Sequence, residues 1–253
     1  MPIRVANAPC SWGVDYADAP DNPPAEAVFA GIGAAGYRAT ELGPYGYAPT
    51  QPAELTSLLG RHGLTLIAGF LFELLHDPRA HATIEAKATD LLGLLKASGG
   101  TRLVLIDHIS PSRERTAGRS DVAARLDTGR FDLMAALCAH LSRRAAAEGI
   151  TAVLHHHAAS HVEFADEVER FLDAVPSLKL CIDTGHAAFA GIDPVALVDR
   201  WGERIGHIHL KDIDPKVRDD AVADACGFDE AVSRGVFVPL GRGVVDFAAF
   251  AEA

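Results

Sequence analysis

Residues 150–186 read ITAVLHHHAASHVEFADEVERFLDAVPSLKLCIDTGH, and this stretch decides the fold. It contains two short apolar runs, Ala152–His157 and Leu178–Asp183, with the length and the Val, Leu and Ile content of buried parallel strands. A helix-like segment, Val162–Ala174, lies between them. Because parallel neighbours need a crossover connection, usually a helix, this stretch predicts an α/β protein with a parallel sheet.

The same alternation extends in both directions along the chain. Further strands are expected at Ile3–Asn7, Ala39–Leu42, Leu64–Phe70, Leu103–Asp107 and Ile205–Leu210. Further helices are expected at Pro24–Ala35, Pro52–His62, Ala80–Ser98, Phe131–Glu148 and Pro194–Trp201. Glycine follows several of these helices directly and supplies the left-handed C-cap, which supports the assignments.

Seven βα units without a linker predict a single domain over residues 1–253. A dinucleotide-binding sheet would carry G-x-G-x-x-G after its first strand, whereas here that strand runs into NAPCSWG (7–13). We therefore expect a (β/α)8 barrel of the TIM type. Residues 244–253, VVDFAAFAEA, read as the start of a helix, so we expect a barrel that lacks its last strand and is truncated at the C-terminus.

Composition and charge exclude several classes of function. The net charge of −11 and the pI of about 5.5 provide no positive field for nucleic acid or an anionic membrane. The four cysteines are scattered without a C-x-x-C, and the N-terminus lacks the pattern of a secretory signal. We therefore expect a cytoplasmic protein with reduced thiols and a small-molecule substrate.

Polar residues repeatedly end the apolar runs, and in a barrel these ends form the active-site face. Seven of the twelve histidines fall between positions 155 and 209. Because strand residues two apart share a face, His155 points the same way as His157, and His207 the same way as His209. Together with Asp183, these imidazoles form a ligand set for zinc, manganese, cobalt or iron.

Each candidate also has a structural interpretation. Asp183 could cap the following segment, and His207 could support His209 without contacting a ligand. Lys211 could belong to a surface ion pair, and Glu41 could be a buried hydrogen-bonding carboxylate. The basic run SPSRERTAGR (110–119) is a solvated loop or a lid.

Six motifs together resemble the inosose dehydratase branch of the xylose-isomerase-like sugar isomerase/epimerase superfamily. They are NAPCSWGV (7–14), ATELGPYGYAPT (39–50), LHHHAASHVE (154–163), CIDTGHAAFAG (181–191), HIHLKDI (207–213) and PLGRGVVDF (239–247). The resemblance runs over essentially the whole chain. It implies a β/α barrel that binds one divalent metal, Mn²⁺ or Co²⁺ first, with Zn²⁺, Fe²⁺ or Mg²⁺ as alternatives.

The resemblance also implies roles for individual residues. Asp183 and His209 match two metal ligands, and His155 stands where the superfamily usually has a ligating Glu. The usual fourth ligand, a Glu on strand eight, has no counterpart in this sequence. His186 matches a histidine that contacts substrate. The remaining expected substrate contacts are Asn7, Trp12, His108 and His207.

These residues suggest a lyase that dehydrates 2-keto-myo-inositol or a similar cyclic polyol ketone. The base would be His157 or Glu41, and the acid His186 or protonated Lys211. A ketose epimerase or isomerase, or a non-catalytic sugar-binding relative, is the alternative. A nuclease on the same fold would need a basic groove, which the net charge disfavours. Relatives of this type often associate, so a homo-oligomer is left open.

Overall fold

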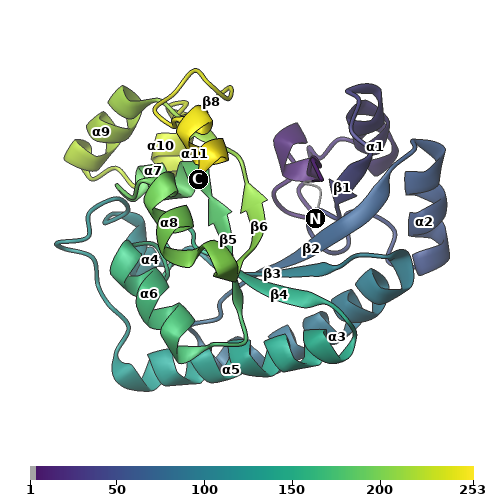
Figure 1. Cartoon of the computed structure of the whole chain (residues 1–253), viewed down its shortest axis with the longest axis horizontal. Helices are drawn as coiled ribbons and strands as arrows, with labels where there is room; N and C mark the ends of the chain where they lie inside the picture. The colour runs from purple at the N-terminus through teal and green to yellow at the C-terminus, as the bar shows by residue number, and fades with distance from the viewer. Residues whose placement is uncertain (1–3) are drawn as a thin grey trace. The chain divides into compact units, whose positions relative to one another are not determined.

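The computed structural model describes residues 4–253 (Figure 1). The chain divides into two compact units. The first contains the described residues up to Leu71 together with Ala82–Val104 and Arg143–Ala152; the second contains Phe72–His81, Leu105–Ser142 and Val153–Ala253. The expectation of one barrel domain over residues 1–253 stays a prediction.

Six strands form one sheet in the order β1-β2-β3-β4-β5-β6, which is also their order along the chain. They are β1 (Ala39–Glu41), β2 (Thr65–Glu73), β3 (Arg102–Asp107), β4 (Thr151–His155), β5 (Lys179–Asp183) and β6 (Ile205–His209). β1 pairs parallel with β2, and β5 pairs parallel with both β4 and β6. This is the parallel α/β sheet that the sequence predicts.

Helices connect these strands and follow the last of them. α1 (Ala25–Ala34) precedes β1. Those between strands of the sheet are α2 (Pro52–Arg61), α3 (His81–Ser98), α4 (Pro111–Glu114), α5 (Thr128–Ala147), α6 (Ala165–Ala174), α7 (Thr184–Phe189) and α8 (Pro194–Trp201). Those after β6 are α9 (Pro215–Asp224), α10 (Phe228–Ser233) and α11 (Phe247–Glu252). None of the described helices is long and apolar enough to cross a membrane.

A first strand was expected at Ile3–Asn7. Ile3 lies outside the described residues, and the described residues 4–7 form no strand, so this prediction is wrong for them. Only Asn7 makes a bridge, parallel to Thr40. Its N–H donates to the Ala39 carbonyl at 3.3 Å, and its own carbonyl accepts from the Glu41 N–H at 3.0 Å. The short 3₁₀ helix Pro9–Trp12 begins two residues later, so the chain leaves the strand direction at once.

Two short strands after β6 were not expected. β7 (Asp212–Ile213) and β8 (Phe237–Val238) pair antiparallel in a separate two-stranded sheet. Asp214 caps α9, the helix after β7, by accepting from the N–H groups of Lys216 and Val217. The predicted helix at the end of the chain is confirmed as α11.

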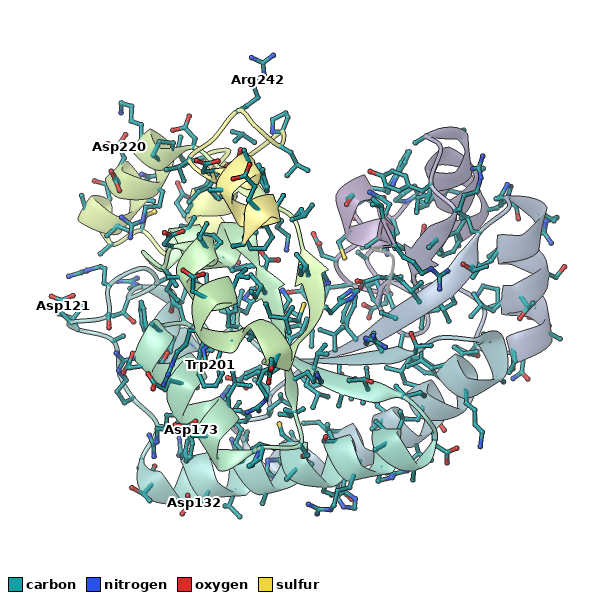
Figure 2. The ribbon with its side chains drawn as sticks, viewed as in Figure 1. Asp121, Asp132, Asp173, Trp201, Asp220 and Arg242 are labelled. Carbon is teal, nitrogen blue, oxygen red and sulfur yellow. The ribbon has the colours of Figure 1, made fainter. Side chains whose placement is uncertain are left out.

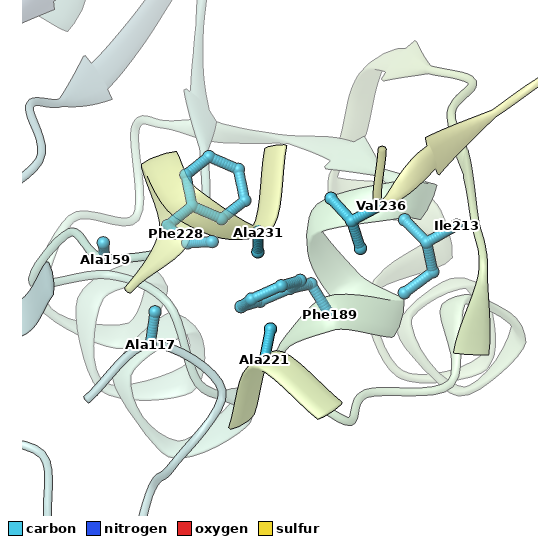
Figure 3. Packing of buried hydrophobic residues seen from close by; sticks show 9 residues of the cluster. Ala117, Ala159, Phe189, Ile213, Ala221, Phe228, Ala231 and Val236 are labelled. Carbon is cyan, nitrogen blue, oxygen red and sulfur yellow. The ribbon is translucent and has the colours of Figure 1, made fainter. Parts of the chain in front are cut away.

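An apolar cluster packs this C-terminal part of the second unit together (Figure 3). Its buried members are Ala117, Ala158, Ala159, Phe189, Ile213, Ala221, Phe228, Ala231 and Val236. They come from the segment after β3, the segment after β4 and the elements from α7 to β8. The strand-end loops of the second unit are therefore held in place by hydrophobic packing.

A buried ion network fixes the segment that was expected to be a solvated loop or a lid. Arg113 is fully buried and makes two bonds to the Glu167 carboxylate, at 2.6 and 3.0 Å, and one to Glu163, at 3.2 Å. Glu163 in turn accepts from the Gly118 N–H at 2.6 Å. The hydrogen bonds of Arg113 and Gly118 therefore tie this segment to the start of α6, although Pro111, Ser112 and Arg115 remain exposed.

Replacing Arg113 with Met should lower the free energy of unfolding by about 3 kcal/mol, because Glu167 loses its bidentate partner in a buried position. This is the low end of the range for breaking a buried pair, since Arg125 still contacts Glu167 at 2.5 Å. Denaturant titration measures the loss. Arg79→Met is the matched control, because the Arg79–Asp77 pair is exposed. Equal stability of the two variants would contradict the prediction.

Candidate functional site

The carboxylate of Asp183 lies at the end of β5 with no exposed surface. Its Oδ1 accepts from the N–H groups of Gly185 at 3.1 Å and His186 at 3.0 Å, and so caps α7. Its own N–H donates to the Nε2 of His156 at 3.3 Å. The capping interpretation and the functional one therefore both hold, because capping uses one oxygen and leaves Oδ2 for other partners.

Three nitrogen-bearing side chains surround Oδ2 of Asp183. The Nε2 of His155 lies 3.2 Å away and the Nδ1 of His209 3.6 Å away, and the Lys211 ammonium is in direct contact. The sheet register explains this, since Asp183 pairs with His209 across β5 and β6. Burial alone would raise the pKa of Asp183, but the Lys211 charge and the bonded imidazoles hold it well below its usual value. The carboxylate is therefore ionised.

His155 and His156 are buried and electrically neutral. Burial lowers the pKa of His155 to about 3 and that of His156 to about 4. The Nδ1 atom of each ring is buried and has no hydrogen-bond partner among the described residues. His156 supports the Asp183 main chain, whereas His155 faces the carboxylate.

His157 and His186 lie side by side, with ring centroids 3.9 Å apart. The peptide groups of Ala158 contact both rings. The Ala158 carbonyl lies 2.8 Å from the Nδ1 of His157, and the Ala158 N–H donates to the Nδ1 of His186 at 3.2 Å. A carbonyl can only accept and an N–H can only donate, so neutral His157 carries its proton on Nδ1 and neutral His186 carries it on Nε2.

The two rings are thus held in opposite tautomers. Nε2 of His157 has a lone pair, and Nε2 of His186 has a proton. Burial lowers the pKa of His157 to about 3 and that of His186 well below its usual value, which keeps both rings neutral. A proton acceptor and a proton donor are therefore held next to each other.

Aromatic side chains surround this pair, and the sequence analysis missed them. Phe228 lies 5.5 Å from His157 and 5.3 Å from His186, and Phe237 lies 5.8 Å from His186. Phe72 lies 5.1 Å from His157 on another side. No sequence signal distinguishes these phenylalanines from core residues.

Thr184 is a further residue that the sequence analysis missed. Its hydroxyl donates to the Lys211 carbonyl at 2.6 Å and accepts from the Lys211 N–H at 2.9 Å. One side chain therefore fixes the main chain at Lys211, which places the ammonium against the carboxylate of Asp183.

The remaining predicted residues have the following places. His108 stacks on Phe72 with ring centroids 4.2 Å apart, and His207 lies 5.2 Å from His209. In the first unit, the Trp12 indole donates to the Asn7 side chain at 2.8 Å, and Glu41 is buried at the end of β1. The substrate-binding or catalytic roles expected for Asn7, Trp12, His108, His207 and Glu41 stay predictions.

The buried donors fit a divalent cation. Ligand atoms of His155, Asp183 and His186 all lie within 4.8 Å of one another. An ionised carboxylate with neutral imidazoles is a nitrogen–oxygen donor set for zinc, manganese, cobalt or iron. Nε2 of His155 and Nδ1 of His209 both face Oδ2 of Asp183, where the Lys211 ammonium already supplies a positive charge.

Parallel strands in chain order, with a carboxylate–imidazole cluster at their ends, define a barrel-type α/β protein with a candidate metal site. The chain belongs to the xylose isomerase-like TIM barrel family, whose model matches residues 29–253. The predicted fold class is therefore confirmed.

Two curated relatives match over nearly the whole chain. The rhizopine catabolism protein MocC of Rhizobium meliloti is 32% identical, over 100% of this chain and 77% of its own length. An inosose dehydratase of Geobacillus kaustophilus is 31% identical, over 97% of this chain and 81% of its own length. The resemblance to the inosose dehydratase branch is thus confirmed.

Among solved structures, the IOLI protein with a binding zinc atom has the same fold. Its TM-score is 0.71 at 14% identity, covering 99% of this chain and 84% of that protein. At this identity the likeness concerns the fold alone.

Acid should destabilise the protein through these neutral histidines. The folded pKa of His156, about 4, lies below the unfolded value near 6.5, so the unfolded chain binds more protons between those values. Stability is therefore complete at neutral pH and is lost as pH falls below about 6.5. His156→Gln removes one such group and should flatten the decline by up to about 1.4 kcal/mol per pH unit.

Denaturant unfolding at several values between about pH 7 and pH 5 measures this slope. The Gln side-chain oxygen occupies the position of Nε2 and can still accept the Asp183 N–H, so the variant should fold at neutral pH. A slope identical to that of the unsubstituted protein would show that His156 does not contribute.

Proposed function

We propose that this chain is a metal-dependent lyase that dehydrates a cyclic polyol ketone, with 2-keto-myo-inositol as the first candidate. One observation carries the proposal: a proton acceptor, Nε2 of His157, and a proton donor, Nε2–H of His186, lie on adjacent rings. Removing water takes a proton from one carbon and hydroxide from the next, so it needs such a pair. The name of the Geobacillus relative supports the choice of substrate.

Asp183, His209 and His155 are the proposed metal ligands. His186 also belongs to the compact buried set, but its Nδ1 is already bonded to Ala158, so ligation would use the Nε2 that the reaction needs as a donor. The family resemblance favours Mn²⁺ or Co²⁺, and the imidazole donors suit Zn²⁺ or Fe²⁺ better than Mg²⁺. A bound divalent metal would polarise the ketone oxygen and acidify the neighbouring C–H.

The reaction steps follow from the protein side chains. His157 accepts the proton from the carbon next to the ketone, and His186 donates its Nε2 proton to the departing hydroxyl, which leaves as water. This leaves His157 as an imidazolium and His186 as an imidazolate. Transfer of the proton from Nε2 of His157 to Nε2 of His186, on the adjacent ring, returns both to their neutral tautomers. Lys211 is the alternative donor and Glu41 the alternative base.

Epimerisation of a ketose is the runner-up. It also begins with removal of the proton next to a ketone, but no group leaves, and the proton returns to the opposite face of the carbon. His157 and His186 are held by the same alanine at adjacent positions, which suits removal of two neighbouring groups better.

Asp183→Asn should abolish metal binding and metal-dependent turnover, because the ionised oxygen at the centre of the donor set is lost. Metal analysis measures metal binding. Dehydration of a keto-inositol gives a dione, and the near-ultraviolet absorbance of this product measures turnover. Asp214→Asn is the matched control, since Asp214 caps α9. Retained turnover in Asp183→Asn would overturn the metal proposal. Bound metal and polyol without any product would indicate a sugar-binding protein.

The two histidines should be separable by isotope exchange in deuterated water. His157→Asn should slow exchange of the proton next to the ketone by about 10²–10⁴-fold, because the base is lost. His186→Asn should keep this exchange and slow release of water. Proton NMR of the substrate follows exchange, and absorbance follows the dione. If both variants lose exchange equally, the assignment of acid and base is wrong. Product of unchanged mass would support the epimerase.

A further inference from the structure

The carboxylate of Asp212 is 1% exposed and accepts four backbone hydrogen bonds. Oδ1 accepts from the N–H groups of Ile213 and Val245, each at 3.0 Å. Oδ2 accepts from Gly241 at 2.9 Å and Gly243 at 2.8 Å. One side chain therefore satisfies four donors, three of which belong to the loop between β8 and α11, near Arg242 in Figure 2.

The shape of this loop depends on the close approach to Asp212. A Cβ atom on Gly243 would lie 2.2 Å from the Ile213 carbonyl oxygen and 2.3 Å from Oδ1 of Asp212. Gly241 has a φ of 78°, which glycine adopts without strain. The loop therefore wraps around the carboxylate and cannot keep this path without it.

The same segment provides part of the wall of the candidate site. β8 pairs with β7, which places Phe237 opposite Ile213. The Phe237 ring lies 5.8 Å from the His186 ring and 6.0 Å from the Lys211 ammonium. Lys211 directly precedes Asp212 in the chain. Lys211 contacts Asp183 in the site, and Asp212 holds the loop, so consecutive residues connect the two.

We infer that Asp212 is a positioning residue: it anchors residues 237–245 and thereby holds Phe237 against His186 and Lys211. Asp212 does not contact the reacting groups itself. Its effect on turnover rests on the proposed function, in which His186 donates a proton, whereas its effect on the place of Phe237 does not.

Asp212→Asn is the most direct test. The side-chain amide offers one acceptor oxygen and turns N–H₂ donors toward backbone N–H groups, so part of the loop must move. NMR of the full chain labelled in its histidines reports the His186 ring, because the nearby Phe237 ring shifts its signals. Asp212→Asn should move these signals in the same direction as Phe237→Leu does.

Two further variants secure this test. Gly243→Ala displaces the loop from its other side and should move the His186 signals similarly. Asp246→Asn removes a carboxylate that only caps α11, and should leave them in place. Folded Asp212→Asn with unmoved His186 signals would overturn the inference; if that variant does not fold, Gly243→Ala decides in the same way.

Turnover provides a second readout. Asp212→Asn should lower kcat by about 10-fold or more while KM stays within about 2-fold, because a displaced catalytic group costs rate. The double variant with Phe237→Leu should be no worse than the poorer single variant, since both act through one contact. Additive losses would contradict the coupling. If the unsubstituted chain does not turn over the keto-polyol, the proposed function fails, and the NMR result still decides the role of Asp212.

Discussion

The ionised carboxylate of Asp183 sets the requirement that the surrounding structure meets. A buried charge is costly unless it is paired and hydrogen-bonded. Here Oδ1 accepts two N–H groups of α7, and Oδ2 faces His155, His209 and the Lys211 ammonium. These partners come from three neighbouring strands or the residues just after them, so the parallel sheet must keep its register for the charge to be tolerated. A slip of one residue would turn every strand-end side chain to the other face.

The positively charged partner of Asp183 is the Lys211 ammonium. Lys211 is held at Oδ2 because Thr184 fixes its main chain through two hydrogen bonds. The Lys211 ammonium therefore supplies positive charge that offsets the buried Oδ2 of Asp183. A divalent ion that binds the same oxygen would compete with the ammonium, so metal affinity would depend on how readily Lys211 moves away. The buried negative charge of Asp183 would thus favour binding of a cation at this site.

The sequence predicted the parts of the site that periodicity can reveal. Strand ends at Asp183 and His209 follow from apolar runs that stop at polar residues, and the register confirms that these two pair. β7 and β8 are two residues each, too short to show any alternation. Phe228 and Phe237 look like core residues in the sequence, and only tertiary packing places them beside His157 and His186. The buried ion pairs of Arg113 could not be predicted, because a basic run normally indicates a solvated loop.

Ala158 links the apolar core to the acid–base pair. Its side chain belongs to the buried cluster of Figure 3, and its peptide groups contact the Nδ1 atoms of His157 and His186. Packing that holds the methyl group therefore also fixes which nitrogen of each ring carries the proton. Since burial keeps both imidazoles neutral, their tautomers, and not their charges, distinguish acceptor from donor. In the proposed lyase, the hydrophobic core would thus assign the roles of the two histidines through the orientation of one peptide segment, without touching a substrate.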